Sequence, residues 1–138
     1  REGLFNQIGP LVVVGADAVW YAAAGSKDPA IAEARAYFEQ NGGDAGTEVG
    51  RLLGSLLREL LDKVAIERIC VAGGDTSSYV TTALDLFALE YARELAPGAP
   101  LCIGRSHDPR YDGITLTLKG GQRGKADFFE CVKRGRLL

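Results

Sequence analysis

The sequence predicts an α/β fold: a single domain in which a mixed β-sheet is packed against helices. Residues 47–64 repeat leucine and valine at three- and four-residue steps, which is the period of a helix with one buried face. The apolar run at residues 66–72 ends at two glycines, a pattern typical of a buried strand. Residues 114–118 alternate apolar and polar side chains, as a strand with one buried face does.

The composition is that of an ordinary globular domain and excludes several classes of protein. The 138 residues carry a net charge of −2, so nothing points to a nucleic-acid partner or an anionic membrane surface. No stretch approaches the ~20 apolar residues of a membrane span, and no signal-peptide pattern is present. The three cysteines, Cys70, Cys102 and Cys131, are widely spaced, so we expect free thiols, a reducing cytoplasmic compartment and no metal site.

Local signals place the elements of the N-terminal half. We expect strands at residues 11–14 and 19–24, with Trp20 and Tyr21 in the core or at its edge. A helix over residues 30–40 opens at an Asp-Pro pair. Thr47 caps the 47–64 helix, and Gly54 on this helix allows another element to pack closely.

Local signals are less decisive in the C-terminal half. Residues 77–95 fit one long helix, or a helix followed by a strand. A turn at 96–100, a short strand at 101–104 and a polar loop at 105–112 follow. The loop holds His107, the only histidine, to which we assign no catalytic role because no second histidine or nucleophile lies nearby in the sequence. A final helix begins at Lys125 or Asp127.

The first candidate functional feature is the glycine-rich turn at residues 73–78, Gly-Gly-Asp-Thr-Ser-Ser, between the 66–72 strand and a helical segment. The Asp, Thr and Ser residues are typical caps of a helix N-terminus. Backbone N–H groups there lack partners and carry partial positive charge, and glycine lets a phosphate approach the backbone. The string lacks the spacing of the known phosphate-loop motifs, so an ordinary capped strand–helix turn explains it equally well.

A second glycine loop, residues 119–124, favours the functional interpretation of the first. Lys119 offers a positive charge to a phosphate, although solvation at the surface is the commoner position for a lysine. A plain connection between a strand and a helix is the alternative explanation of this loop.

With both loops considered, the chain resembles the nucleotide-binding C-terminal domain of the four-carbon acid sugar kinases, which include kinases of threonate, erythronate and 3-oxo-tetronate. The resemblance runs from about Ala23 to the end. Three strings carry it: VAGGDTSSYVTTAL at 71–84, ALEYARELAPGAPLC at 88–102 and LTLKGGQRGKADFF at 116–129. The family shows GG[DE]TSG, ALEVGGEIAPGVP and LKSGNFG..DFF.

The chain departs from the family pattern at several positions. Ser78 replaces a glycine of the first loop, and Gly120 and Arg123 replace a serine and a phenylalanine of the second. The sequence Tyr-Ala-Arg at 91–93 replaces a small VGG stretch, which brings the long side chain of Arg93 near the nucleotide cleft.

The resemblance implies a fold detail and a site. Residues 88–95 would form a strand, and both loops would hold ATP. The expected nucleotide-binding residues are Gly73, Gly74, Asp75, Thr76, Ser77, Lys119, Gly121 and Gly124. Asp75 or Thr76 would orient Mg²⁺ through water, because Mg²⁺ keeps much of its hydration. Ser26 is the candidate for an upstream serine that contacts the nucleotide in the family.

The resemblance also implies a division of labour between two domains. The chain starts at Arg1 and contains no methionine, so we expect residues 1–138 to be the C-terminal nucleotide-binding part of a longer kinase. An N-terminal domain would bind the acid sugar and supply the general base, which we cannot name here. We therefore expect the 138-residue chain to bind nucleotide weakly and to turn over no substrate alone.

Two other function classes fit the same residues. A non-catalytic module that binds a nucleotide or phosphoanion and regulates a partner would keep both loops but would need no acid-sugar domain. A scaffold or dimer module would use the loops only as turns. Titration with Mg-ATP separates the scaffold from the two binding classes, and a homodimer is left open for all three.

Overall fold

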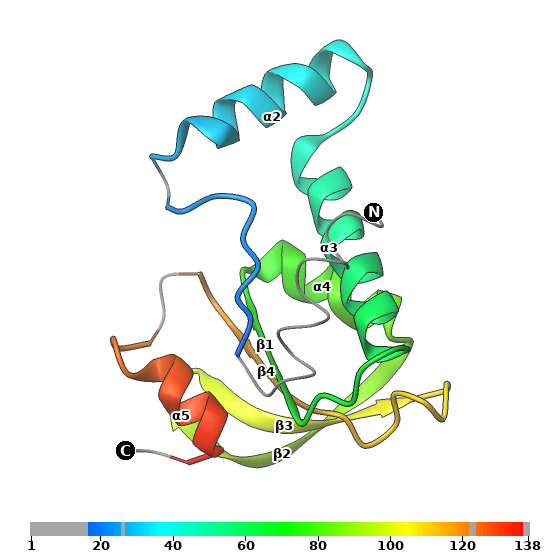
Figure 1. The fold of residues 1–138 in the computed structure, drawn as a ribbon, viewed down its shortest axis with the longest axis vertical. Coiled ribbons are helices and arrows are strands. Elements are labelled where there is room, and N and C mark those ends of the chain that lie inside the picture. Colours follow the sequence, from blue (N-terminus) through cyan, green and yellow to red (C-terminus); the bar gives the residue numbers. More distant parts are fainter. Residues whose placement is uncertain (1–16, 26, 122–123, 137–138) are drawn as a thin grey trace.

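The computed structural model describes residues 17–25, 27–121 and 124–136 (Figure 1). Within them a four-stranded sheet has the order β1-β4-β3-β2. Strand β1 (Arg68–Ala72) pairs in parallel with β4 (Thr115–Lys119). Strand β3 (Ala99–Ser106) pairs antiparallel with β4 on one side and with β2 (Leu86–Ala96) on the other. The sheet is mixed, which confirms the predicted α/β class.

Helices cover both faces of this sheet. The helices of the described residues are α2 (Pro29–Gln40), α3 (Ala45–Leu61), α4 (Gly74–Ala83) and α5 (Phe128–Arg134), and the last three cover the sheet. In Figure 1, α3 and α4 lie together on one side of the strands, α5 lies near their other side, and α2 projects away from the sheet. None of the helices in the described ranges is long and apolar enough to cross a membrane.

Each face of the sheet has its own hydrophobic core. Alternation along β1 points Ile69 and Val71 toward α4, where they pack with Val80, and points Cys70 to the opposite face. The core under α3 and α4 consists of Ile69, Val71, Val80, Leu84, Tyr111 and Leu116. The core under α5 consists of Leu95, Ala99, Leu101, Phe128 and Val132. Strand β4 contributes to both faces, so the expected single buried face of residues 114–118 is wrong.

Two glycines bring α3 close to α4. A Cβ atom on Gly50 would lie 2.1 Å from Cδ2 of Tyr79, and one on Gly54 would lie 2.9 Å from the backbone oxygen of Tyr79. The hydroxyl of Tyr79 donates to Oγ1 of Thr47 at 3.0 Å. The predicted close approach at Gly54 is confirmed, and Gly50 contributes to the same contact.

Three predictions for the N-terminal half are wrong. Residues 19–24 form no strand, and within the described residues β1 pairs only with β4. Tyr21 is 70% exposed, which corrects its expected position, whereas Trp20 is partly buried and does not contradict a place at the edge of the core. Asp44 rather than Thr47 caps α3: its carboxylate accepts a hydrogen bond from the N–H of Thr47 at 2.8 Å, so the helix starts at residue 45. The expected strand at 11–14 lies outside the described residues, as does residue 26.

The family resemblance correctly predicted the structure of residues 77–95, which local patterns left ambiguous. Residues 74–83 are helical and 86–96 form β2, so the strand expected at 88–95 is confirmed and the single long helix is excluded. Strands β2 and β3 join in a hairpin at Pro97 and Gly98, where Gly98 has φ +74°. Strand β3 runs to residue 106, beyond the expected end at 104, and the ring of His107 lies against that of Phe87 at 4.6 Å.

Candidate functional site

The two glycine loops begin side by side, at the carboxyl ends of β1 and β4. Strands β1 and β4 are parallel neighbours with Ala72 opposite Lys119, so their carboxyl ends meet. The N–H of Gly73 donates to the carbonyl oxygen of Lys119 at 2.9 Å. Ligands of open α/β sheets bind beyond the carboxyl ends of the strands, which is where both loops stand. The structure thus joins two stretches that are 46 residues apart in sequence, from 73 to 119.

The first loop presents free backbone donors. Gly73 is the N-cap of α4, with φ +116°, and it offers no side chain to the helix. Within the described part of the chain, no hydrogen bond leaves the N–H groups of Gly74, Asp75 or Thr76. Ser77 is turned inward, since both its N–H and its hydroxyl donate to the carbonyl of Gly73, at 2.9 and 2.7 Å.

The position of Asp75 and Thr76 differs from the sequence prediction. They lie inside the first turn of α4, whereas the predicted cap preceded the helix. The reason is the left-handed φ of Gly73, which lets the chain leave β1 and begin the helix at the next residue. Three unpaired N–H groups at the positive end of a ten-residue helix can accept an anion.

Each loop has one glycine whose backbone is not covered by neighbouring side chains in the part of the chain that the structure describes. A Cβ atom added to Gly74 or to Gly121 would meet no atom of the described residues within 4 Å, chain neighbours aside. A phosphate can therefore approach the backbone closely at both glycines, so the residues present fit a bound nucleotide. Gly124 has a different reason to be glycine: its φ is +99°, and an added Cβ would lie 2.9 Å from Cγ of Phe128.

Lys119 does not lie where the sequence suggested. It is only 8% exposed, so it does not take the solvated surface position that is commoner for a lysine. Its ammonium donates to the carbonyl oxygens of Gly120 at 3.0 Å and Gly121 at 3.1 Å, and it lies 5.6 Å from the centroid of the Phe128 ring. Burial of a charged lysine requires such partners, because an unpaired ammonium in an apolar setting is costly.

The family follows from comparison with known proteins. The family model described as "Nucleotide-binding C-terminal domain" matches residues 4–129. The chain belongs to this family. The resemblance predicted from the two loops is thereby confirmed.

Relatives in this family are named as acid sugar kinases. The chain is 44% identical over 126 residues to a 3-oxo-isoapionate kinase of Paraburkholderia graminis, covering 89% of this chain and 27% of the relative. It is 37% identical over 98 residues to a 3-oxo-tetronate kinase of Pseudomonas fluorescens, covering 70% of this chain and 22% of the relative. The chain thus spans about a quarter of the length of the curated relatives that it matches.

Solved structures support the fold of this family member. A Haemophilus influenzae protein assigned to a family of unknown function matches with a TM-score of 0.69 at 25% identity, covering 97% of this chain and 31% of that one. A Bordetella bronchiseptica domain, described as a domain-swapped dimer with bound citrate, matches with a TM-score of 0.63 at 23% identity. That alignment covers 100% of this chain and 38% of the other.

Sequence reasoning missed the part that Phe128 plays at this site. The family string contains it, but the residue entered the prediction only as a member of the last helix. In the structure Phe128 is 3% exposed, and its ring packs against Gly124 and beneath the ammonium of Lys119. Its signal was the glycine loop that ends at Gly124, shortly before Phe128 in the sequence, because such a loop needs an apolar support.

The sheet order sets the backbone of Arg93 apart from the two glycine loops. This residue pairs with Leu101 across the β2–β3 ladder, and Leu101 pairs with Thr117 of β4. Arg93 therefore lies two strand spacings from β4, about 10 Å, on the exposed edge strand. Strand β3 separates it from the two glycine loops.

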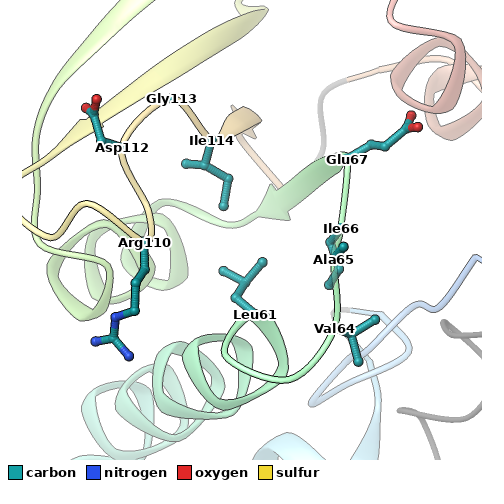
Figure 2. Close-up of a pocket in the computed structure, with 9 residues that line it drawn as sticks. All are labelled: Leu61, Val64, Ala65, Ile66, Glu67, Arg110, Asp112, Gly113 and Ile114. Atoms are coloured by element: carbon teal, nitrogen blue, oxygen red, sulfur yellow. The ribbon is translucent and has the colours of Figure 1, made fainter.

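A cavity of about 510 Å³ lies at the opposite end of the parallel strands (Figure 2). It is lined by Leu61, Val64, Ala65, Ile66, Glu67, Arg110, Asp112, Gly113 and Ile114. In Figure 2 the side chains of Leu61 and Ile114 face each other across it, and Glu67 points away. Arg110 is paired with Asp62 and Asp108, so its charge is already balanced. We assign the cavity no role, because its polar side chains do not converge on a ligand position.

The cysteines behave as predicted in the described part of the chain: Cys70, Cys102 and Cys131 are all free. Burial raises the pKa of the Cys70 thiol to about 11, and the nearby ammonium of Lys119 opposes this shift. A thiol with this pKa is protonated at neutral pH and is a poor nucleophile. The described residues contain no cluster of three or more His, Cys, Asp or Glu side chains that could hold a metal.

Proposed function

We propose that this chain is the ATP-binding domain of a kinase that phosphorylates a hydroxyl group of an acid sugar. The substrate class is a four-carbon acid of the threonate, erythronate or 3-oxo-tetronate type. The names of the two relatives described above share a 3-oxo acid, and this favours an acid sugar of that kind.

One observation carries the proposal: two bare loops from distant parts of the chain are joined at the carboxyl ends of β1 and β4. The hydrogen bond from Gly73 to Lys119 fixes their separation, and the open space at Gly74 and Gly121 leaves room for phosphates. A capped turn would bind these N–H groups with the side chain of its N-cap residue, whereas Gly73 offers no such cap and leaves them free.

The chain's own residues would act by positioning and by neutralising charge, which is most of what phosphoryl transfer requires. The N–H groups of Gly74, Asp75 and Thr76 would hold phosphate oxygens. Mg²⁺ would arrive with the nucleotide, and the Asp75 carboxylate, which is exposed in the first turn of α4, would contact it through water. Ser77 would keep the turn in shape through its bonds to Gly73.

The acid sugar and the general base would come from an N-terminal domain of the same protein. The chain covers 27% of the 3-oxo-isoapionate kinase that it resembles, so a longer parent has room for that domain. Residues 1–138 would then form one nucleotide-binding unit that is inactive alone.

Titration with Mg-ATP, followed through the backbone amides, tests the proposal. We expect the amide signals of residues 73–77 and 121 to shift. Gly74→Val and Gly121→Val should each weaken binding at least tenfold, because a side chain there fits the free protein but occupies the phosphate position. Gly43→Val is the matched control, since its Cβ meets Phe38 at an ordinary 3.6 Å, and it lies in the connection between α2 and α3 and not in either loop. Equal affinity of all three variants, or no shift in the wild type, contradicts the proposal.

A further inference from the structure

We propose that Lys119 is a positioning residue of the second glycine loop: its ammonium holds two loop carbonyls inward, and this turns a backbone N–H toward the nucleotide. The inference rests on the proposed function, because it assigns a role at the same phosphate site. It differs from the sequence prediction, in which the lysine charge meets the phosphate directly.

The direction of the ammonium is the first support. Lys119 follows Thr117 by two residues on β4, so both side chains point to the face that α5 covers. There the ammonium has three donors to satisfy. Two go to the carbonyls of Gly120 and Gly121, at 3.0 and 3.1 Å, and the third side of the ammonium faces the ring of Phe128.

The geometry of the peptide bond supplies the second step. In a trans peptide the C=O of one residue and the N–H of the next point in opposite directions. Because the carbonyl of Gly120 points at the buried ammonium, the N–H of Gly121 points away from it. Gly121 is exposed, and a Cβ there would meet nothing within 4 Å among the described residues, so this N–H has room for a phosphate oxygen.

The backbone of Lys119 fixes the loop to the rest of the site. Its carbonyl accepts the hydrogen bond from Gly73, which is the N-cap of the first loop. The side chain therefore sets the direction of the second loop, and the main chain sets its distance from the first. Phe128 contacts both the ammonium of Lys119 and Gly124, so the first residue of α5 packs against the second glycine loop.

The experiment uses the 138-residue chain, Mg-ATP and NMR of both backbone amides and lysine ammonium groups. In the wild type we expect the Lys119 ammonium signal to stay unchanged when Mg-ATP is added, while the amide of Gly121 shifts. A Lys119 signal that moves or couples to phosphorus shows direct contact and overturns the inference.

Three variants separate positioning from simple stabilisation. Lys119→Met keeps the apolar stem and loses the donors, so we expect a shifted Gly121 amide without nucleotide and roughly ten- to hundredfold weaker Mg-ATP binding. Lys119→Arg, which keeps N–H donors, should recover much of the affinity. Lys125→Met removes the same charge from an exposed position near the loop and should change the affinity less than about twofold.

The outcomes for the two proposals are distinct. If the wild type shows no amide shift with Mg-ATP, the proposed function fails and the inference that rests on it fails too. If the wild type binds but Lys119→Met binds equally well below its melting temperature, only the inference is overturned. A lysine that merely stabilises the fold gives that second result, since the melting temperature falls and the affinity does not.

Discussion

From the contact between α3 and α4 we predict that one mutation changes the free energy of unfolding in opposite directions, depending on whether a second mutation is present. Gly50→Ala places a methyl group 2.1 Å from Cδ2 of Tyr79, closer than any two carbon atoms approach without bonding. The Tyr79 ring must leave its position, and its hydrogen bond to Thr47 is lost. Removing the ring in advance, with Tyr79→Ala, removes this conflict.

The magnitude follows from three contributions to the free energy of unfolding. Overpacking costs about 1–3 kcal/mol. Loss of a neutral hydrogen bond adds about 1 kcal/mol. Alanine in place of glycine inside a helix contributes about 1 kcal/mol in the opposite direction. Gly50→Ala should therefore destabilise the wild type by about 1–3 kcal/mol and stabilise the Tyr79→Ala background by up to about 1 kcal/mol.

Urea unfolding of the four chains in this cycle measures the reversal. Gly54→Ala is the matched control, because its Cβ would meet the backbone oxygen of Tyr79 at 2.9 Å, and that atom remains in Tyr79→Ala. Gly54→Ala should destabilise both backgrounds. If Gly50→Ala has the same effect with and without the Tyr79 ring, the close contact described here is refuted.

Three further predictions concern pH, thiol reactivity and catalysis. Hydrogen bonds from Arg110 lower the pKa of Asp108 from 3.8 to about 2, so its stabilisation is complete above about pH 4 and is lost as the pH falls through about 2. Asp108→Asn should lower the melting temperature at pH 7 but not below about pH 2, and an equal effect at both contradicts the pairing. Iodoacetamide should label native Cys70 slowly at pH 8 and faster toward pH 11, because burial raises its pKa to about 11; rapid labelling at pH 8 contradicts that burial. Kinase assays of the 138-residue chain with four-carbon acids should give no turnover, and clear turnover would refute the division of labour between two domains.

Much of the fold was readable from local patterns. The leucine stripe gave α3 to within three residues at each end, and the alternation at 114–118 gave β4 to within one. Local periodicity could not decide residues 77–95, because a strand at the sheet edge is stabilised by its partner. Strand β2 is exposed along most of its length, so its sequence lacks the burial pattern of a central strand.

The errors have a common cause, which is that burial depends on what lies opposite. Residues 19–24 have strand-like composition, but no neighbouring strand pairs with them in the described residues. Lysine is by type a surface residue, yet Lys119 is buried because its ammonium donates to two backbone carbonyls and lies over an aromatic ring. Neither fact can be computed from the residues on either side.

The sequence alone determined the α/β class, the two glycine loops and the family, because these depend on residues that are close together in the chain. The tertiary structure decided that the loops meet. It inserts β4 beside β1, and this pairing of strands more than forty residues apart is what brings Gly73 to Lys119. The reason is physical: hydrogen bonds between strands join distant segments, and no local pattern encodes which segments they join.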